Sequence, residues 1–265
     1  MAGTPTCIAI DWSGDATAAG QRRKIVAATV RDGRVTAVTS GRTRAEVAHW
    51  LAATVGAGTD RDGRTLIGLD FSFSVPEWFA RAHACTSIDA VWTLVAEHGE
   101  QWLRDCAPPF WGRAETRCTL ETADRYRACE QRLRALRRQP KSIFQIGGAG
   151  AVGTGSLRGI PWLVWLRQRG FAIWPFDAVG TQTAFEVYPS LYARVATNDA
   201  TGRAAHLAAL PSSVLAPRER DAAVASDDAF DAVVSALAMW ERRDELLSRD
   251  AATDATTAIE GAMWV

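Results

Sequence analysis

The sequence predicts a mixed α/β fold in which a sheet of parallel and antiparallel strands is flanked by helices. Two short apolar runs, Cys7–Ile10 and Thr65–Leu69, read as buried strands, and each is followed directly by an aspartate. A helical pattern precedes the second run, so the two strands can lie parallel in one sheet. Asp11 and Asp70 are then expected at the same edge of that sheet.

The segment after Asp11 predicts two further strands. Lys24–Val30 and 35–40 are rich in β-forming residues, and Arg31-Asp32-Gly33-Arg34 between them contains the Asp-Gly signal of a hairpin. Thr43-Arg-Ala-Glu46 then has the spacing of a capping box, and apolar residues follow it at helical intervals. The chain is therefore expected to run strand, strand, strand, helix and strand.

The second half is expected to begin with a helical insertion at about 77–160, within one domain that covers 1–265. This insertion is rich in Arg and Trp and is broken at Pro108-Pro109 and by Gly147-Gly148-Ala149-Gly150. Ile160-Pro161 resembles a helix start. Strands are predicted at 171–174 and 184–188, and a last helix is predicted to begin at Ser226.

Composition limits the class of protein. The chain has 265 residues, of which 48% are hydrophobic, and its 30 basic and 30 acidic side chains cancel. Attachment to nucleic acid by bulk charge is therefore not expected, and any such contact must be local. Five cysteines without CxxC spacing favour neither disulfides nor zinc. Without a signal peptide or membrane span in the pattern, a cytoplasmic location is expected.

Acidic residues at element ends are the candidate site. An ionised carboxylate at the end of a buried strand needs a cation, hydrogen-bond donors or solvent, although an aspartate there can also simply stabilise a turn. Glu186 lies in the strand predicted at 184–188, where a surface-facing position is the alternative. Asp227 and Asp228 fall in the first turn of the last helix, which the helix dipole alone explains. Asp231 lies beyond that turn, where the dipole explanation weakens.

Convergence of these acids predicts a metal site. Asp11, Asp70, Glu186 and Asp231 are the expected catalytic residues, with Asp228 as a further metal ligand. Several carboxylates in a small volume repel one another unless cations neutralise them, and oxygen ligands suit Mg²⁺ or Mn²⁺.

Five segments resemble a known family, the domain-of-unknown-function 429 family: Ile8–Gly14, Gly68–Pro76, Phe144–Gly153, Glu186–Pro189 and Asp228–Leu237. The resemblance spans nearly the whole chain and rests on the order of the motifs. It implies a ribonuclease H-like fold and a nuclease activity. The Asp-x-x-Asp-Ala spacing at Asp228 and Asp231 is also similar to the last helix of Holliday-junction resolvases of the ribonuclease H superfamily, whose acids hold the metals.

Two regions are candidates for binding a phosphate-bearing substrate. From Gln101 to Lys141 there are nine Arg and one Lys against five acidic residues. Arg134, Arg137 and Arg138 crowd one predicted helix there and favour a nucleic-acid contact, although a solvated helix face is the alternative. The second region, 147–159, contains Ser156 and Arg158 and could present N–H groups to a phosphate or be a flexible connector.

The leading functional hypothesis is hydrolysis of phosphodiester bonds in nucleic acid by a two-metal carboxylate site. A nucleotide-dependent phosphotransferase on an actin-like core is the second hypothesis, and a non-catalytic binding module is the third. The sequence leaves open whether DNA or RNA is the substrate, as well as the oligomeric state.

Overall fold

A computed structural model describes residues 4–56, 63–113, 115–148, 150–193, 195 and 199–265. Within these residues a mixed sheet contains six strands in the order β3-β2-β1-β4-β6-β5. The strands are β1 (Thr6–Asp11), β2 (Val26–Arg31), β3 (Arg34–Thr39), β4 (Thr65–Asp70), β5 (Ala172–Ile173) and β6 (Gln182–Glu186). The expectation of a mixed α/β fold is confirmed.

The first three strands form an antiparallel meander, and the rest of the sheet is parallel. β2 pairs antiparallel with both β1 and β3, whereas β4 is parallel to β1 and to β6. The predicted Asp-Gly turn joins β2 to β3, with Asp32 at φ 48° and Gly33 at φ 74°. This positive-φ pair fits the twist of a hairpin. The parallel pairing of β1 and β4 confirms that Asp11 and Asp70 share one edge.

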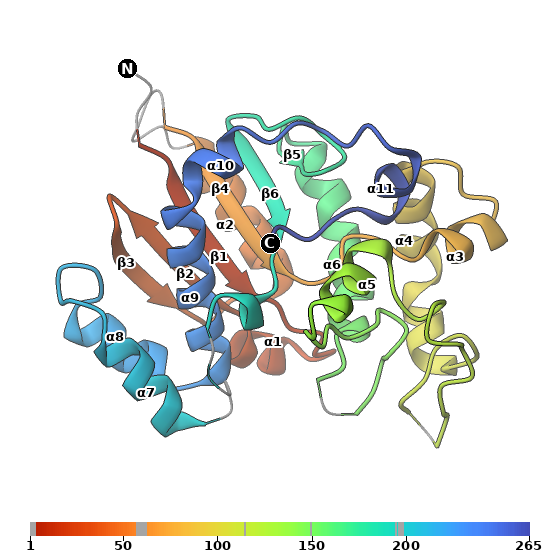
Figure 1. Ribbon diagram of the computed structural model, residues 1–265, viewed down its shortest axis with the longest axis horizontal. Helices are drawn as coiled ribbons and strands as arrows, with labels where there is room; N and C mark the ends of the chain where they lie inside the picture. The colour runs from red at the N-terminus through yellow and green to blue at the C-terminus, as the bar shows by residue number, and fades with distance from the viewer. Residues whose placement is uncertain (1–3, 57–62, 114, 149, 194, 196–198) are drawn as a thin grey trace.

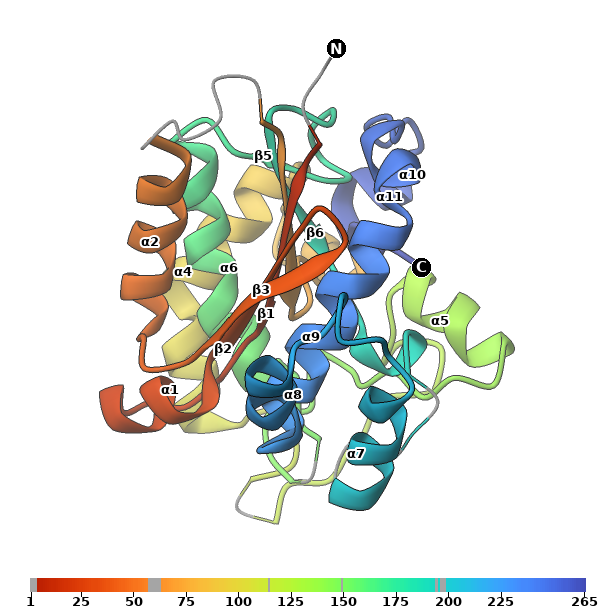
Figure 2. The ribbon, with the colours of Figure 1, turned by 90° about the vertical axis from the view of Figure 1, so that its left-hand side faces the viewer.

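Helices cover both faces of the sheet (Figures 1 and 2). One face carries α2, α4 and α6, and the other carries α9 with α7, α8 and α10 beside it. The helices are α1 (Ala18–Lys24), α2 (Arg44–Gly56), α3 (Glu77–Ala82), α4 (Ile88–Asp105), α5 (Ala128–Ala135), α6 (Gly153–Arg167), α7 (Ala200–Ala208), α8 (Pro217–Val224), α9 (Asp227–Glu241), α10 (Arg243–Leu247) and α11 (Ala255–Glu260), with a short 3-10 turn at Pro189–Leu191.

Alternation along the buried strands builds two separate cores. Ile8 and Ile10 of β1 pack with the helices α2, α4 and α6, whereas Cys7 and Ala9 pack with α9. Successive side chains of a strand point to opposite faces, so a strand buried on both sides is apolar throughout. Asp11, the last residue of β1, follows four buried apolar residues and lines a cavity.

Two helix starts agree with their predicted caps. Thr43 and Glu46 exchange hydrogen bonds at the start of α2, as a capping box requires. The Ser226 hydroxyl accepts from the Ala229 N–H at the start of α9. This cap fixes where the helix begins and thereby which of its acids face the sheet.

The segment 77–160 contains α3, α4, α5 and the start of α6, with long loops between α4 and α5 and between α5 and α6. The predicted helix start at Ile160-Pro161 is wrong, because α6 begins at Gly153 and carries Pro161 inside it. A second difference concerns the arginines. α5 ends at Ala135 and Arg137 adopts φ 59°, so Arg137 and Arg138 follow the helix instead of lying on it.

Local hydrogen bonding explains the elements that sequence patterns missed. α1 begins where the Thr17 hydroxyl caps the Gly20 N–H, so β2 starts at Val26 and not at Lys24. α7 and α8 are short helices outside the sheet and lack a long apolar stripe. β5 is two residues long, and β6 ends at Glu186.

Candidate active site

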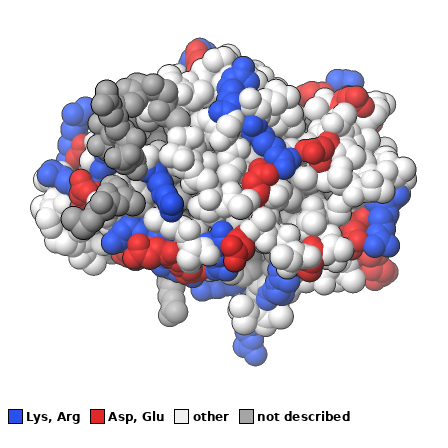
Figure 3. Space-filling model, turned by 90° about the horizontal axis from the view of Figure 1, so that it is seen from above, with Lys and Arg blue, Asp and Glu red and all other residues white. Residues whose placement is uncertain are grey.

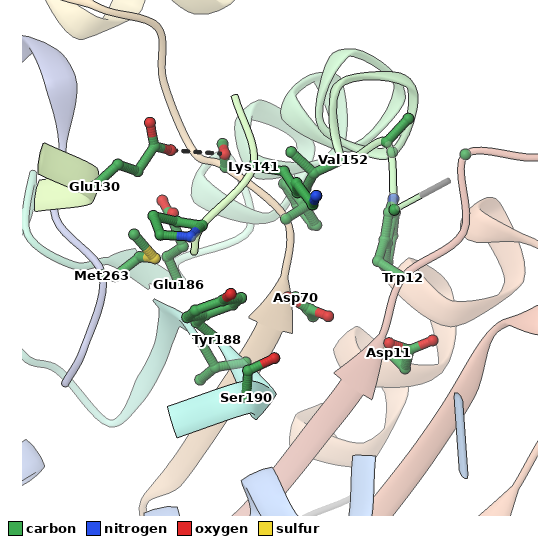
Figure 4. Close-up of a pocket in the computed structure, with 18 of the residues that line it drawn as sticks. Asp11, Trp12, Asp70, Glu130, Lys141, Val152, Glu186, Tyr188, Ser190 and Met263 are labelled. Atoms are coloured by element: carbon green, nitrogen blue, oxygen red, sulfur yellow. Dashed lines mark hydrogen bonds between the residues drawn. The ribbon is translucent and has the colours of Figure 1, made fainter. Parts of the chain in front are cut away.

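Asp11 and Asp70 occupy equivalent places at the ends of adjacent parallel strands. Asp11 pairs directly with Asp70 in the β1–β4 register. Directly opposed residues of neighbouring strands point to the same face, and both aspartates line one pocket, as Figure 4 shows. The sheet itself therefore holds these two acids side by side.

Helix α9 adds two more acids from the opposite layer. It packs against β1 and β2, and its N-terminal end lies at the same edge of the sheet as Asp11. Asp228 and Asp231 are one turn apart on α9, so their side chains share one side of the helix. The structure thus brings together Asp11, Asp70, Asp228 and Asp231, which we call the acidic cluster.

The carboxylates of the acidic cluster affect one another's pKa values. Burial raises the pKa of Asp11 well above its usual value, and the charges of Asp70, Asp228 and Asp231 raise it further. Burial raises the pKa of Asp70 to about 7, despite a hydrogen bond with Asp11 that acts in the opposite direction. Asp11 also shares a side-chain hydrogen bond with Asp228. Without a cation, burial and the neighbouring negative charges therefore favour the protonated form of Asp11.

Asp231 is the least satisfied member of the acidic cluster. Its Oδ1 atom is buried and has no hydrogen-bond partner in the described structure. Burial and the charges of Asp70, Asp227 and Asp228 raise its pKa to about 8, although Arg203 acts in the opposite direction. A buried carboxylate oxygen without a partner is costly, so this atom is suited to a ligand that arrives from outside.

Glu186 lines the same pocket, but its carboxylate already has partners. Both of its oxygens accept hydrogen bonds from the Arg127 guanidinium, and Oε2 also accepts from the Phe73 N–H at 2.9 Å. Glu186 is only 2% exposed. The structure therefore does not present Glu186 as a free metal ligand, in contrast to the sequence expectation.

Arg127 ties the helical segment to the sheet and was not singled out from the sequence. It is fully buried, pairs with Glu130 at 2.8 Å and with Glu186, and donates to the Glu260 carbonyl. Glu260 in turn accepts from the N–H groups of Glu77 and Ala128. We call Arg127, Glu130 and Glu186 the buried ion cluster. An Arg and a Glu three residues apart were its only sequence signal.

A cavity of about 410 Å³ opens beside the acidic cluster. Its walls come from the ends of β1, β4 and β6, from the N-terminal turn of α9, and from the loop that enters α6. Figure 4 shows Trp12, Tyr188 and Lys141 around the carboxylates. The cavity therefore combines acidic, aromatic and basic side chains, of which the sequence predicted only the acids.

The arginines expected to bind substrate have different positions. Arg134 is exposed and stacks on Tyr126, with its Cζ 4.4 Å from the ring centroid. Arg137 is also exposed. Arg138 is half-buried, and it opposes the effect of burial, which raises the pKa of Tyr188 in the cavity wall. Arg138 is therefore the one of the three whose charge reaches a cavity residue.

Ser156 and Arg158 are structural in this molecule, which corrects their expected role in direct substrate binding. Ser156 is fully buried, and its hydroxyl accepts from the Ser72 N–H and donates to the Val152 carbonyl. Arg158 pairs with Glu100 and donates to the Gly14 carbonyl. Neither side chain lines the cavity at the acidic cluster. Ala149 of the predicted phosphate loop lies outside the described residues.

The carboxylate oxygens of the acidic cluster are the donor atoms that divalent cations prefer. Its four side chains, all within the described residues, are not arranged around a common ion position. Among the described residues, no three His, Cys, Asp or Glu side chains stand ready to hold an ion together. None of the ion pairs in the described structure involves the four acids of the cluster. Rotation of Asp11 away from its hydrogen bonds would free oxygens for hard cations.

The face of the molecule opposite the acidic cluster has a different distribution of charge. Figure 3, viewed from above, shows acidic and basic side chains intermixed over the face remote from the acidic cluster. No helix in the described ranges is long and apolar enough to cross a membrane.

Fold and site together define a mixed α/β protein with acidic side chains converging at the carboxyl ends of its parallel strands. The chain belongs to the DUF429 family, described as protein of unknown function, whose family model matches residues 10–254. This match confirms the resemblance seen in the sequence motifs. It includes every member of the acidic cluster and of the buried ion cluster. No curated protein and no solved structure was found to match the chain.

Proposed function

We propose that this protein is a metal-dependent nuclease that hydrolyses phosphodiester bonds of nucleic acid at the acidic cluster. One observation carries the proposal: two strand-end carboxylates in register, Asp11 and Asp70, line one cavity together with Asp228 of α9. Asp231, one turn further along α9, acts electrostatically on Asp11 from behind this cavity wall. Buried carboxylates that raise one another's pKa are costly for folding alone. Such an arrangement is expected where a function requires it.

The topology supports a ribonuclease H-like fold. An antiparallel meander of β1 to β3 is followed by a helix and by β4 parallel to β1, as that expectation requires. β6 then extends the parallel half of the sheet, and α9 crosses β1 and β2. Fold likeness does not define an activity, so the proposal depends on the site.

Asp11, Asp70, Asp228 and Asp231 would hold Mg²⁺ or Mn²⁺ in this proposal. When bound, two such ions lower the pKa of a water nucleophile and stabilise the leaving oxygen. Asp11 is the central residue of the chain for this chemistry, because the charges of Asp70, Asp228 and Asp231 all act on its carboxyl. It must lose its proton before its oxygens can face a cation.

Glu186 contributes by position in this mechanism. Its hydrogen bond to the Phe73 N–H fixes the chain three residues after Asp70, and Arg127 holds Glu186 in place. The end of β4 is therefore held rigidly, which preorganises the Asp70 carboxylate.

Nucleic acid is the proposed substrate because cations and aromatic rings surround the acidic cluster. Lys141, Tyr188 and Trp12 line the cavity, and Arg138 acts electrostatically on Tyr188. Phosphates are attracted by such cations, and bases stack on such rings. Without these side chains, the acidic cluster would repel a polyanion.

The test is cleavage of labelled single-stranded DNA, branched DNA and RNA with Mg²⁺, with Mn²⁺ and with EDTA. We expect cleavage of at least one substrate with a divalent cation and none with EDTA. Asp70→Asn should abolish the activity, whereas Asp105→Asn, at an exposed position of α4, should leave it unchanged. Calorimetric titration with Mn²⁺ adds a readout without substrate. Metal binding without cleavage of any substrate would favour a non-catalytic binding module.

A further inference from the structure

We propose that the turn after β1 and the first turn of α6 form a phosphate-binding subsite in the wall of the cavity. The subsite consists of the Gly14 N–H, the Trp12 indole N–H, the N–H groups of Thr154 and Gly155, and the Lys141 ammonium group. It deepens the proposed nuclease function, because it would hold a phosphate of the substrate strand next to the one at the acidic cluster. Its observations are independent of the acids.

The turn after β1 is held from behind by two arginines. Arg44 donates to the carbonyls of Ser13 and Asp15 at 2.7 and 2.9 Å, and Arg158 donates to the Gly14 carbonyl. Both arginines line a second cavity, separate from the one at the acidic cluster. Three successive carbonyl groups are therefore turned away from the acidic cluster toward the arginines.

Peptide geometry then determines the direction of the amide groups. In a planar trans peptide the C=O and the N–H point in opposite directions. Because the Ser13 carbonyl faces Arg44, the Gly14 N–H faces away from it, and Gly14 lines the cavity. The Asp15 N–H is taken by the Ser13 hydroxyl, whereas the Gly14 N–H has no acceptor among the described residues. Gly14 thus offers a free donor to the cavity.

The first turn of α6 adjoins this donor. A Cβ on Gly14 would lie 2.6 Å from the Gly155 nitrogen, so glycine is required for the two backbones to touch. The N–H groups of Thr154 and Gly155 donate to no described residue, and α6 has neither a side-chain cap nor an acid in its first turn. Uncapped N–H groups at the start of a 15-residue helix favour an anion.

Trp12 supplies an independent sign of a missing acceptor. Its side chain is 9% exposed, and its Nε1 atom is buried without a hydrogen-bond partner in the described structure. Trp12 lines the cavity, and Figure 4 shows its side chain above Asp11, on the side of the loop that enters α6. Buried indole N–H groups usually have a partner, so a ligand oxygen would satisfy this one.

Lys141 completes the subsite with a positive charge. It lines the same cavity, and its Nζ lies 4.0 Å from the position of a Cβ on Gly150, at the entry to α6. Lys141 makes no ion pair with any residue in the described part of the chain. The wall beside the four carboxylates thus combines neutral N–H donors with one positive charge. This combination suits a bound phosphate.

The test is to measure binding of inorganic phosphate by isothermal titration calorimetry. The buffer contains EDTA so that no metal contributes to the binding. Gly155→Ala places a methyl group 3.7 Å from the Gly14 nitrogen, an ordinary contact that covers the donor without a clash. We expect phosphate binding at least about tenfold weaker in Gly155→Ala and in Trp12→Phe, which each lose a hydrogen bond to an anion. Thermal stability should not fall in Gly155→Ala, because alanine favours the helix.

The matched control is Gly99→Ala, a helical glycine in α4 whose added methyl group has ordinary contacts at 3.4 Å and beyond. It should bind phosphate like the wild type. Absence of phosphate binding to the wild type, or equal affinity in Gly155→Ala, would overturn the subsite. A wild type that binds phosphate but cleaves no nucleic acid with Mn²⁺ would retain the subsite and remove the nuclease proposal.

Discussion

Two groups of acids, one fully buried and one partly buried, lie at neighbouring strand ends of the same sheet, and only the fully buried group is neutralised. In the buried ion cluster, the Arg127 guanidinium lies between the carboxylates of Glu130 and Glu186. In the acidic cluster, carboxylates have one another as near neighbours, and burial together with their negative charges raises the pKa of Asp11 and Asp231. The same type of side chain is therefore a structural anchor in one place and an unsatisfied group in the other.

Because of this difference, substitutions in the two clusters should change stability in opposite directions. A paired buried ion is already compensated, so removing its partner damages folding. A group of unpaired carboxylates destabilises the fold. Substituting one of them should therefore raise the free energy of unfolding and abolish the proposed metal-dependent cleavage. The four predictions that follow test this contrast, from the largest expected effect to the smallest.

Arg127→Met should destabilise the protein by about 3–5 kcal/mol, because Glu130 and Glu186 would remain buried without a counterion. Denaturant unfolding followed by circular dichroism measures the change. Arg134→Met, at an exposed position outside the buried ion cluster, is the control and should change stability by less than about 0.5 kcal/mol. A loss below about 1 kcal/mol for Arg127→Met would show that the two clusters do not differ as described.

Asp231→Asn should reduce metal-dependent cleavage by at least about a hundredfold, or about 2.7 kcal/mol in the activation free energy, while the protein stays folded. The substitution retains volume and removes a charge whose pKa is raised to about 8 by burial and by neighbouring carboxylates. The metal-free variant should melt at the same temperature as the wild type or higher. An unchanged cleavage rate would remove Asp231 from the site.

Stability of the metal-free protein should fall as the pH rises from about 4 to 8. Asp70 and Asp231 have pKa values raised to about 7 and about 8, so the folded chain retains protons that the unfolded chain releases near pH 4. Each group therefore stabilises folding at low pH and loses this contribution as the pH passes its folded pKa, by at most about 1.4 kcal/mol per pH unit.

Denaturant unfolding in EDTA between pH 5 and pH 8.5 measures this dependence, and Asp231→Asn should have a shallower slope. Mg²⁺ or Mn²⁺ should reverse the loss above pH 7, since bound cations favour the ionised carboxylates. Parallel curves for the variant and the wild type would contradict the assigned coupling.

Substituting Arg134, Arg137 and Arg138 with Gln should weaken nucleic-acid binding and flatten its salt dependence. Each lost phosphate contact lowers the slope of log affinity against log salt by about 0.9 for duplex DNA, and by about 0.7 for a single strand. Arg169→Gln, at an exposed arginine stacked on Trp165, is the control. An unchanged slope would place the polyanion elsewhere.

Sequence patterns predicted the elements that carry strong local signals. The strands that end at Asp11 and Asp70, the Asp-Gly hairpin and the cap at Ser226 were all placed correctly, because periodicity and capping are local properties. The start of α6 was misplaced because Pro161 imitates a first-turn proline. Short elements such as α1 depend on single hydrogen bonds, which patterns do not reveal.

The site was predictable only in part, for a physical reason. Strand-end aspartates can be brought together by topology alone, so Asp11 and Asp70 could be paired from the sequence. The partner of Glu186 could not, because Arg127 reaches it from a distant segment through tertiary packing. The same holds for Trp12 and Lys141, whose place in the cavity depends on how 141–155 folds back against the turn after β1.

The order of the acids along the chain has a consequence for synthesis. Asp11 and Asp70 lie within the first 70 residues, whereas Asp228 and Asp231 lie far downstream on α9 (Asp227–Glu241). A nascent chain on the ribosome has the first pair long before the second, and it lacks the helix that covers one face of the sheet. The proposed activity therefore cannot appear until α9 has been synthesised and has packed against β1 and β2, because two of the four carboxylates are missing before then.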